Sequence, residues 1–195
     1  YAENVIVELN ISHPESLIGI HDIYTPAEQG KREPIPMTDP EQRIGTIGIQ
    51  VDPAKIQAIV ISEEPDAPSL IVPPDEETKT MANLLLDFFR DEIKAGRLTN
   101  ELMPLQSGVG SVANAVLDGF AESEFENLVV ASEVLQDAVF NLIDAGKVRF
   151  AAAASITLTK ELQEKVYGNL EAYADKICLR PQEISNHPEL IRRLG

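Results

Sequence analysis

The sequence predicts an α/β fold of open, mostly parallel sheets with flanking helices. Beyond residue 75, short apolar runs alternate with stretches whose apolar residues recur every three or four positions. Strands that alternate with helices in this way favour a parallel sheet covered by those helices. Hydrophobic residues make up 44% of the 195 residues, so the chain can bury a core of this kind.

The first 62 residues contain short apolar runs separated by turn residues. These runs predict strands at residues 5–7, 17–20, 44–51 and 56–62. His13-Pro14 reads as a turn between the first two, and Asp52-Pro53 as the turn of a strand pair formed by the last two. Four prolines among charged residues exclude a regular helix or a β-strand over residues 25–43. We predict that these residues form a long loop.

A second proline-rich stretch, residues 65–74, separates this part from the rest of the chain. Proline-rich, polar segments commonly link domains. We therefore predict a domain boundary here, with residues 1–72 in one domain and residues 73–195 in the next.

The long helical periods begin after this boundary. Asp75 can cap a helix that Gly96 ends. Its predicted apolar stripe consists of Met81, Leu84, Leu85, Phe88, Phe89 and Ile93. The same reasoning predicts strands at 128–131, 148–154 and 177–179, helices through 112–116, 135–143 and 162–170, and a last helix that opens near Pro188.

Charge and cysteine content exclude several classes of partner. The chain has 32 acidic and 16 basic residues, a formal net charge of −16, which argues against nucleic acid and anionic membrane. It contains no run of about 18 apolar residues, so it predicts no transmembrane helix. A single cysteine, Cys178, cannot form an internal disulfide and fits a reducing compartment. We expect a cytoplasmic protein, or a mitochondrial one in a eukaryote.

Two segments stand where active sites of open α/β sheets form, at the carboxyl ends of strands. The turn 107–110, Ser-Gly-Val-Gly, precedes a predicted helix and offers free N–H groups for an anion or oxyanion. Ser132-Glu133 follows the predicted strand 128–131, and adjacent strand ends would bring Glu133 towards that turn. Each also has a purely structural interpretation, since glycines are common turn residues and a helix dipole favours glutamate in the first turn.

A dinucleotide-binding site is the alternative interpretation of the same turn. Residues 108–113 fit the pattern G-x-G-x-x-A, and Glu133 follows the next predicted strand, as an acidic residue for a ribose would. The preceding Pro104 is unfavourable for a buried parallel strand. A Rossmann-type, NAD-binding oxidoreductase therefore remains the second candidate.

The remaining polar residues carry weaker signals. The three histidines, His13, His21 and His187, lack the spacing of metal ligands, and we predict no metal site. Cys178 lies inside a predicted strand and reads as a small core residue. Asn186 precedes Pro188, where helix capping alone would explain it.

The chain contains the strings IGIHDIY at 18–24, PIPMTDPEQRIG at 34–45, LQSGVGSVANAVLDGF at 105–120, FENLVVASEVLQD at 125–137 and RPQEISNHPELIRRLG at 180–195. These five strings resemble the acetyl-CoA hydrolase/transferase family, the branch of class I CoA-transferases that includes succinyl-CoA:acetate CoA-transferases. Members of this family are longer and have two α/β domains with an active site between them. The resemblance thus implies an internal fragment: the C-terminal part of the N-terminal CoA-transferase domain, then the first part of the C-terminal one.

The resemblance also implies roles for individual residues. Glu133 matches the nucleophile that forms a glutamyl-CoA thioester, and Asn186 matches an asparagine near the acyl group. The Val109 N–H corresponds to an oxyanion-hole donor. The residues that would line the CoA thioester are Leu105, Gln106, Ser107, Gly108 and Val109. Ser132 stands where the family carries a threonine-like residue and keeps its hydroxyl.

The function that the resemblance implies is CoA transfer between acyl-CoA and short-chain carboxylates of acetate metabolism, or hydrolysis of acetyl-CoA. A carboxylate is ionised at neutral pH, so it attacks without a general base, which suits a chain lacking a Ser-His-Asp or Cys-His arrangement. Coenzyme A is then a substrate, and no permanently bound cofactor is expected. The resemblance further implies a homodimer at full length and an inactive isolated fragment.

Overall fold

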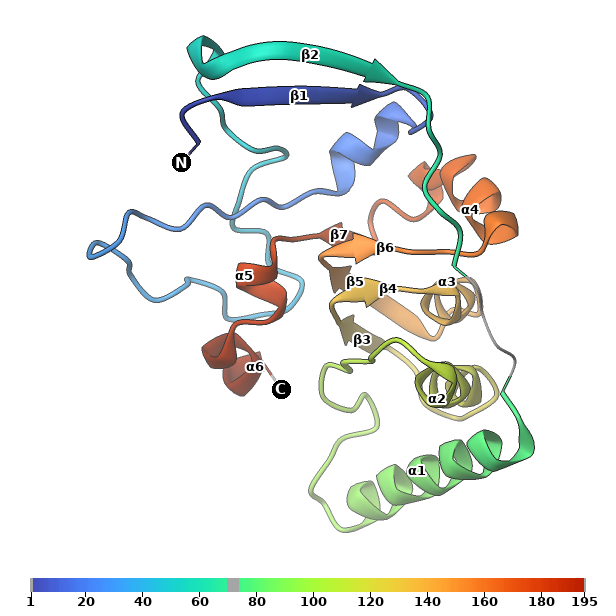
Figure 1. The fold of residues 1–195 in the computed structure, drawn as a ribbon. Helices are drawn as coiled ribbons and strands as arrows, with labels where there is room; N and C mark the ends of the chain where they lie inside the picture. The colour runs from blue at the N-terminus through green and yellow to red at the C-terminus, as the bar shows by residue number, and fades with distance from the viewer. Residues whose placement is uncertain (1, 70–73, 195) are drawn as a thin grey trace.

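Three parallel strands form the central sheet, in the order β3 (Leu128–Ala131), β5 (Val148–Ala153) and β7 (Ile177–Leu179) (Figure 1). The computed structural model describes residues 2–69 and 74–194. All three strands lie where the apolar runs predicted them. The predicted class, an α/β fold with a parallel sheet, is confirmed.

Single residues extend the sheet at both edges. Leu105 bridges Val130 of β3, and His21 bridges Leu179 of β7, both in parallel orientation. A short parallel pair, β4 (Val134–Leu135) with β6 (Ser155–Ile156), continues the direction of the sheet beyond the ends of β3 and β5. The bridges made by Leu105 and His21 thus fix two loops from distant parts of the chain beside the sheet.

Helices lie on both sides of the sheet in Figure 1. On one side are α1 (Glu76–Lys94), α2 (Ser111–Ala121), α3 (Asp137–Asp144) and α4 (Lys160–Tyr167). On the other side are the short α5 (Gln182–Ser185) and α6 (Pro188–Leu194), next to the long loop from the first part of the chain. The predicted last helix thus begins at Pro188, whereas α5 was not predicted.

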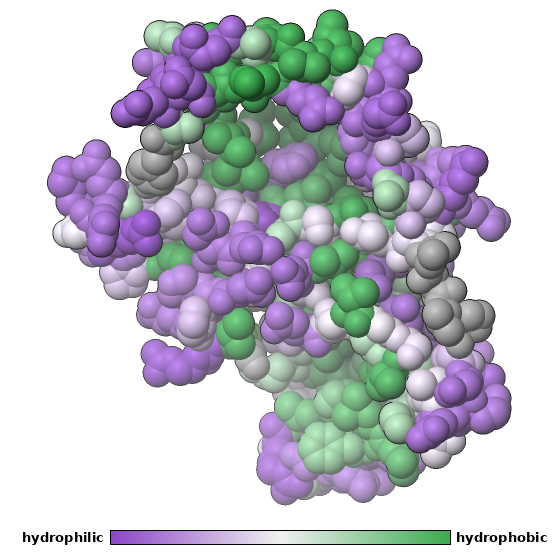
Figure 2. Space-filling view, viewed as in Figure 1, coloured by the Kyte–Doolittle hydropathy of each residue, from purple (hydrophilic) through white to green (hydrophobic). Residues whose placement is uncertain are grey.

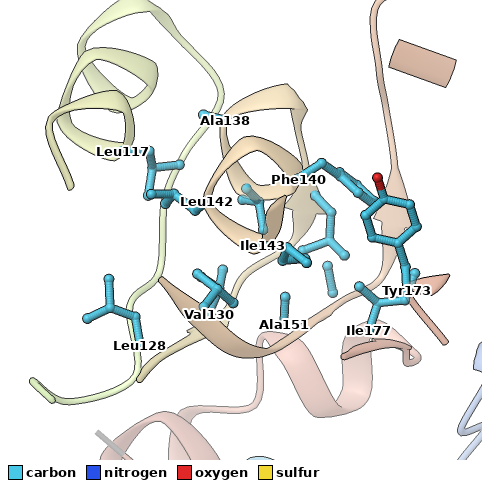
Figure 3. Packing of buried hydrophobic residues seen from close by; sticks show 14 of the residues in the cluster. Leu117, Leu128, Val130, Ala138, Phe140, Leu142, Ile143, Ala151, Tyr173 and Ile177 are labelled. Atoms are coloured by element: carbon cyan, nitrogen blue, oxygen red, sulfur yellow. The ribbon is translucent and has the colours of Figure 1, made fainter. Parts of the chain in front are cut away.

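The main hydrophobic core lies between the sheet and the helices α2 and α3. Leu142 and Ile143 of α3 lie over Val130 of β3 and Ala151 of β5, and all four side chains are buried (Figure 3). The predicted helix through 135–143 begins only at Asp137, because Leu135 belongs to β4. The helix predicted through Leu170 likewise ends earlier, and Leu170 opens the 3-10 turn η3 (Leu170–Ala172). Both leucines are nevertheless core residues.

Helix α1 begins and ends as predicted, but only part of its apolar surface is buried against the rest of the protein. The Asp75 carboxylate accepts a hydrogen bond from the Thr78 N–H at 2.8 Å, and Gly96 follows the helix with a φ of +73°. The fully buried apolar positions are Ala82 and Leu86. Much of the predicted stripe is exposed, namely Met81, Leu84, Leu85 and Phe88. Figure 2 shows this apolar surface in green at the bottom of the molecule.

The first part of the chain contains one separate pair of parallel strands, β1 (Val5–Asn10) and β2 (Ile56–Ser62). Both strands were predicted, but the pairing of 56–62 with 44–51 was wrong. Asp52-Pro53 does not turn a hairpin, because the Asp52 carboxylate caps the 3-10 turn η2 (Pro53–Lys55). Strand β2 therefore pairs with the distant β1.

The strands predicted at 17–20 and 44–51 are absent from the described structure. Residues 17–20 lie in the 3-10 helix η1 (Glu15–Ile20), because an apolar run this short suits a helical turn as well as a strand. In 44–51, only Thr46 makes a bridge, to Ile23. The reason is that the Ile44 and Gly45 N–H groups bond to the Asp22 carboxylate, at 3.0 and 2.6 Å, instead of to a strand.

The loop predicted at 25–43 is confirmed, and it packs against the second half of the chain. Met37 of this loop forms a small core with Ile184 of α5 and Leu190 of α6. The buried Arg180 guanidinium donates to the carbonyls of Pro40 and Gln42, at 2.7 and 2.9 Å. The boundary predicted at 72/73 lies outside the described residues, and the division into two domains stays a prediction.

Asp22→Asn is expected to lower the free energy of unfolding by about 1.5–3 kcal/mol, the scale of a hydrogen bond to a charged group. Asp22 is 2% exposed and lies 3.4 Å from the buried Arg180 guanidinium. An amide keeps one acceptor but turns an NH₂ group towards these donors. Urea unfolding measures the loss, with Glu28→Gln as control because it breaks only an exposed ion pair with Lys31. Equal effects of both variants would contradict the role of Asp22.

Candidate active site

The glycine turn is placed at the carboxyl end of the sheet by Leu105. The Leu105 N–H donates to the Val129 carbonyl at 2.8 Å, and the Ala131 N–H donates to the Leu105 carbonyl at 2.8 Å. Leu105 thus adds one strand-like residue to the edge of β3. The chain then leaves the sheet, so residues 106–110 lie where β3 ends.

Glu133 lies at the same end of the sheet, in the link between β3 and β4. The Ser132 N–H donates to the Ala152 carbonyl, and the Ala154 N–H donates to the Glu133 carbonyl, each at 2.9 Å. These bonds fix the main chain of Glu133 between the ends of β3 and β5. The exposed Glu133 side chain accepts a hydrogen bond from the Gln182 amide, with Nε2 to Oε1 at 2.9 Å.

Side chains on either side of Glu133 hold the glycine turn. The Ser132 hydroxyl donates to the Ser107 carbonyl at 2.7 Å, and the Gln136 amide donates to the Gly108 carbonyl at 3.2 Å. Ser132 and Gln136 are 1% and 5% exposed, so both bonds are made by buried side chains. The Glu133 segment and the turn, which the sequence predicted to be neighbours, are therefore bonded to each other.

The turn ends in a conformation that only glycine adopts readily. Gly110 has a φ of +153° and stands at the N-cap of α2, where its carbonyl accepts from the Asn114 N–H at 3.0 Å. Val109 before it is 75% exposed. No described residue accepts a hydrogen bond from the Val109 N–H. A free N–H beside the positive end of a helix dipole can bind a developing negative charge.

Two cavities flank the segment before the turn. One, of about 200 Å³, lies between this segment and the helices α1 and α2, and the predicted CoA-lining residues Leu105, Gln106, Ser107 and Gly108 are part of its wall. The other, of about 110 Å³, is lined by Gln106, Ala131, Ala152 and Arg180 together with the loop 25–43, α5 and α6. Gln106 lines both cavities. Val109 lines neither of them and faces solvent.

Asn186 and Gln182 belong to the same short helix, which follows β7. Asn186 is the exposed C-cap residue of α5, and its N–H donates to the Gln182 carbonyl at 2.9 Å. Within the described ranges, the Asn186 side chain has no hydrogen bond to Glu133. Gln182, which the sequence analysis did not single out, makes that contact instead. Its position just after a parallel strand was the signal that could have identified it.

Other nucleophiles and possible metal ligands lie away from this arrangement. Cys178 is fully buried in β7, and burial raises the pKa of its thiol, so the thiolate is disfavoured. The described part of the chain contains no group of three or more His, Cys, Asp or Glu side chains placed to hold a metal ion. Likewise, no helix in residues 2–69 and 74–194 is long and apolar enough to cross a membrane.

The fold is that of CoA-transferase domains. The chain superposes on RipA from Yersinia pestis with a TM-score of 0.63 at 18% identity, covering 100% of this chain and 37% of RipA. It superposes on 4-hydroxybutyrate CoA-transferase from Porphyromonas gingivalis with a TM-score of 0.58 at 20% identity, covering 97% of this chain and 39% of that one. No family model matches the chain.

In sequence, acetyl-CoA hydrolases are homologous to this chain over its full length. It is 45% identical over 194 residues to the acetyl-CoA hydrolases of Candida albicans and Schizosaccharomyces pombe, and 42% identical to that of Saccharomyces cerevisiae. In each case the match covers 100% of this chain and 37% of the relative. The family resemblance seen in the sequence is thereby confirmed, and the Rossmann-type alternative is not favoured.

Proposed function

We propose that this polypeptide is an acyl-CoA:carboxylate CoA-transferase or acetyl-CoA hydrolase that acts through a glutamyl-CoA thioester on Glu133. One observation carries the proposal. At the carboxyl end of the parallel sheet, the exposed Glu133 carboxylate lies in a segment that is hydrogen-bonded to the glycine turn, and this turn contains the free Val109 N–H. The homology to acetyl-CoA hydrolases supports the substrate class. Because the chain spans 37% of those relatives, the activity is proposed for the full-length polypeptide.

The first half-reaction exchanges CoA from the substrate onto Glu133. A Glu133 oxygen attacks the thioester carbonyl, and the C–S bond breaks to give an acyl-glutamyl anhydride and CoA thiolate. The thiolate then attacks the glutamyl carbonyl, and the acyl group leaves as a carboxylate. Glutamyl-CoA remains, so the atoms and charges balance without any base.

The second half-reaction decides between transfer and hydrolysis. A second carboxylate attacks glutamyl-CoA and, by the same steps in reverse, leaves as a new acyl-CoA. When water attacks instead, the C–S bond breaks, CoA is released as the thiol, the Glu133 carboxylate is restored and one proton passes to solvent. Carboxylates are weak nucleophiles, so orientation must supply much of the rate, and it can contribute about 7–11 kcal/mol.

Each tetrahedral intermediate places negative charge on one oxygen, and the Val109 N–H is the proposed donor to it. Its free hydrogen and its position before α2 support this role. The Gln182 amide orients the attacking Glu133 carboxylate. Asn186, in the same helix, assists near the acyl group, and the residues 105–109 contact the CoA thioester.

Acetyl-CoA consumption by the full-length polypeptide distinguishes these functions. We expect slow release of free CoA in acetyl-CoA alone and a faster conversion to succinyl-CoA when succinate is added, because a carboxylate competes with water for glutamyl-CoA. Chromatography of the CoA species measures both. A rate that no carboxylate changes would assign the protein as a hydrolase only. Binding of NAD without any reaction of acetyl-CoA would contradict the proposal and favour the oxidoreductase.

A further inference from the structure

We propose that Gln136 is a positioning residue that aims the Val109 N–H at the oxyanion. The inference rests on the proposed function, because it concerns the donor that this function assigns to Val109. Its starting point is the hydrogen bond from the Gln136 side-chain amide to the Gly108 carbonyl, at 3.2 Å. This bond joins residues 28 positions apart and is made by a side chain that is 5% exposed.

The Gly108 carbonyl and the Val109 N–H belong to one peptide group. Such a group is planar, and in its trans form the C=O and N–H bonds point in opposite directions. The described structure contains no cis peptide bond. When Gln136 holds the Gly108 oxygen on the buried side, the Val109 hydrogen must therefore face the opposite, open side. The bond also polarises the peptide, which makes the N–H a stronger donor.

Packing does little to hold this peptide group in place. A side chain built at Gly108 or Gly110 would meet no atom within 4 Å, so packing does not restrict the turn there. Glycine also lacks the steric barrier that keeps other residues in one region of φ and ψ. Without a hydrogen bond to its carbonyl, the 108–109 peptide could rotate and turn the donor away. The Ser107 hydroxyl also donates to the Gly108 carbonyl, at 3.3 Å, but Ser107 belongs to the same turn. The restraint from outside the turn comes from the Gln136 side chain, at 3.2 Å.

The neighbouring peptide is held in the same way from the same segment. The Ser132 hydroxyl binds the Ser107 carbonyl at 2.7 Å, which fixes the plane that precedes Gly108. Ser132 and Gln136 stand on either side of Glu133. The segment that carries the nucleophile thus also fixes the loop that carries the oxyanion donor, and the distance between the two is set by a single short stretch of chain.

The local structure of Gln136 gives no other reason for a glutamine here. Gln136 is the N-cap residue of α3, a position at which Ser, Thr, Asp or Asn would bond the free N–H groups of the helix. Its side chain makes no capping hydrogen bond. The side chain reaches the glycine turn instead, so helix α3 forgoes a cap. A residue that breaks a local rule in this manner is expected at a functional site.

Gln136→Met in the full-length polypeptide tests the inference, because methionine fills the same space without donating a hydrogen bond. We expect kcat for acetyl-CoA turnover to fall by about 10- to 100-fold, less than the loss of a whole oxyanion donor. KM for acetyl-CoA should stay within about threefold, since the donor acts on the transition state rather than on bound substrate. A wild-type kcat, or a KM that rises as much as kcat falls, would overturn the inference.

Gln136→Glu supplies a test within one folded variant. Its carboxylate cannot donate to the Gly108 carbonyl, whereas its protonated form can. The activity of Gln136→Glu relative to wild type should therefore rise as the pH is lowered, while that of Gln136→Met stays level. Gln136→Met, measured over the same pH range, reports the pH effects that do not come from the new carboxyl group. A level ratio for Gln136→Glu would overturn the inference.

A matched control removes a comparable bond at the opposite end of the sheet. Lys147, just before β5, donates to the Ser123 carbonyl at 2.9 Å. Lys147→Met should lower stability without changing kcat, and a loss of kcat equal to that of Gln136→Met would count against the inference. Mass spectrometry of wild type after acetyl-CoA treatment separates the two proposals. If wild type forms no glutamyl-CoA, the proposed function fails; if it does and Gln136→Met forms it equally fast, only the positioning role fails.

Discussion

Glu133→Ala in the full-length polypeptide is expected to abolish both CoA transfer and covalent labelling by acetyl-CoA. Alanine cannot form the thioester, and loss of a nucleophile elsewhere lowers kcat on the order of 10⁶-fold. The substitution should leave folding unchanged, because the Glu133 side chain is exposed and its hydrogen bond in the described structure is to Gln182. Peptide mass spectrometry, with borohydride to reduce the thioester, locates the label and measures its loss.

Glu126→Ala is the matched control for this result. Glu126 is an exposed carboxylate near the other end of β3, and it forms only a loose ion pair with Lys147 at 3.6 Å. Its removal should leave the label and the rate unchanged. A label found on Asp137 or Glu124 would contradict the assignment of Glu133, and so would full activity of Glu133→Ala.

Val109→Pro should lower kcat by about 10²–10³-fold, the effect of losing one oxyanion donor. Proline removes the N–H that no described residue binds, and it fixes φ near −65°. Val109→Ala keeps the donor and should retain most of the activity, because the valine side chain is 75% exposed and packs little. Comparing kcat of the two variants separates the main chain from the side chain.

Proline can also distort the turn, so the thermal midpoint and the affinity for CoA are measured beside the rate. A Val109→Pro protein that folds, binds CoA and turns over like wild type would remove Val109 from the mechanism. A large loss of kcat in Val109→Ala would show instead that side-chain packing sets the site. Either result would also remove the basis for the positioning role of Gln136.

The local sequence pattern was sufficient to predict several elements with their bounds. The strand 128–131 was predicted with its observed bounds, and α1 lies between the predicted cap Asp75 and the predicted stop Gly96. Capping and apolar periodicity act within a few residues, so they can be read without knowing the neighbours. The loop 25–43 could also be predicted from local sequence, because its prolines exclude the hydrogen bonds of a β-strand.

Local pattern failed where a distant group competes for the main chain. Residues 44–51 have the composition of a strand, but the Asp22 carboxylate binds the N–H groups at its start. The apolar stripe of α1 is wider than the face that α2 covers, and the sequence does not tell which part is buried. In both places the local preference of the residues does not decide the structure, because the deciding contact comes from another segment of the chain.

For the site, the sequence by itself indicated which residues stand at the strand ends: Glu133 and the glycine turn. Only the tertiary structure decided how they are held. Gln136 reaches the turn across 28 positions, and Gln182 reaches Glu133 across 49. Parallel strands bring together segments that are far apart in the chain, so the partners of a side chain at their ends follow from the sheet order β3-β5-β7.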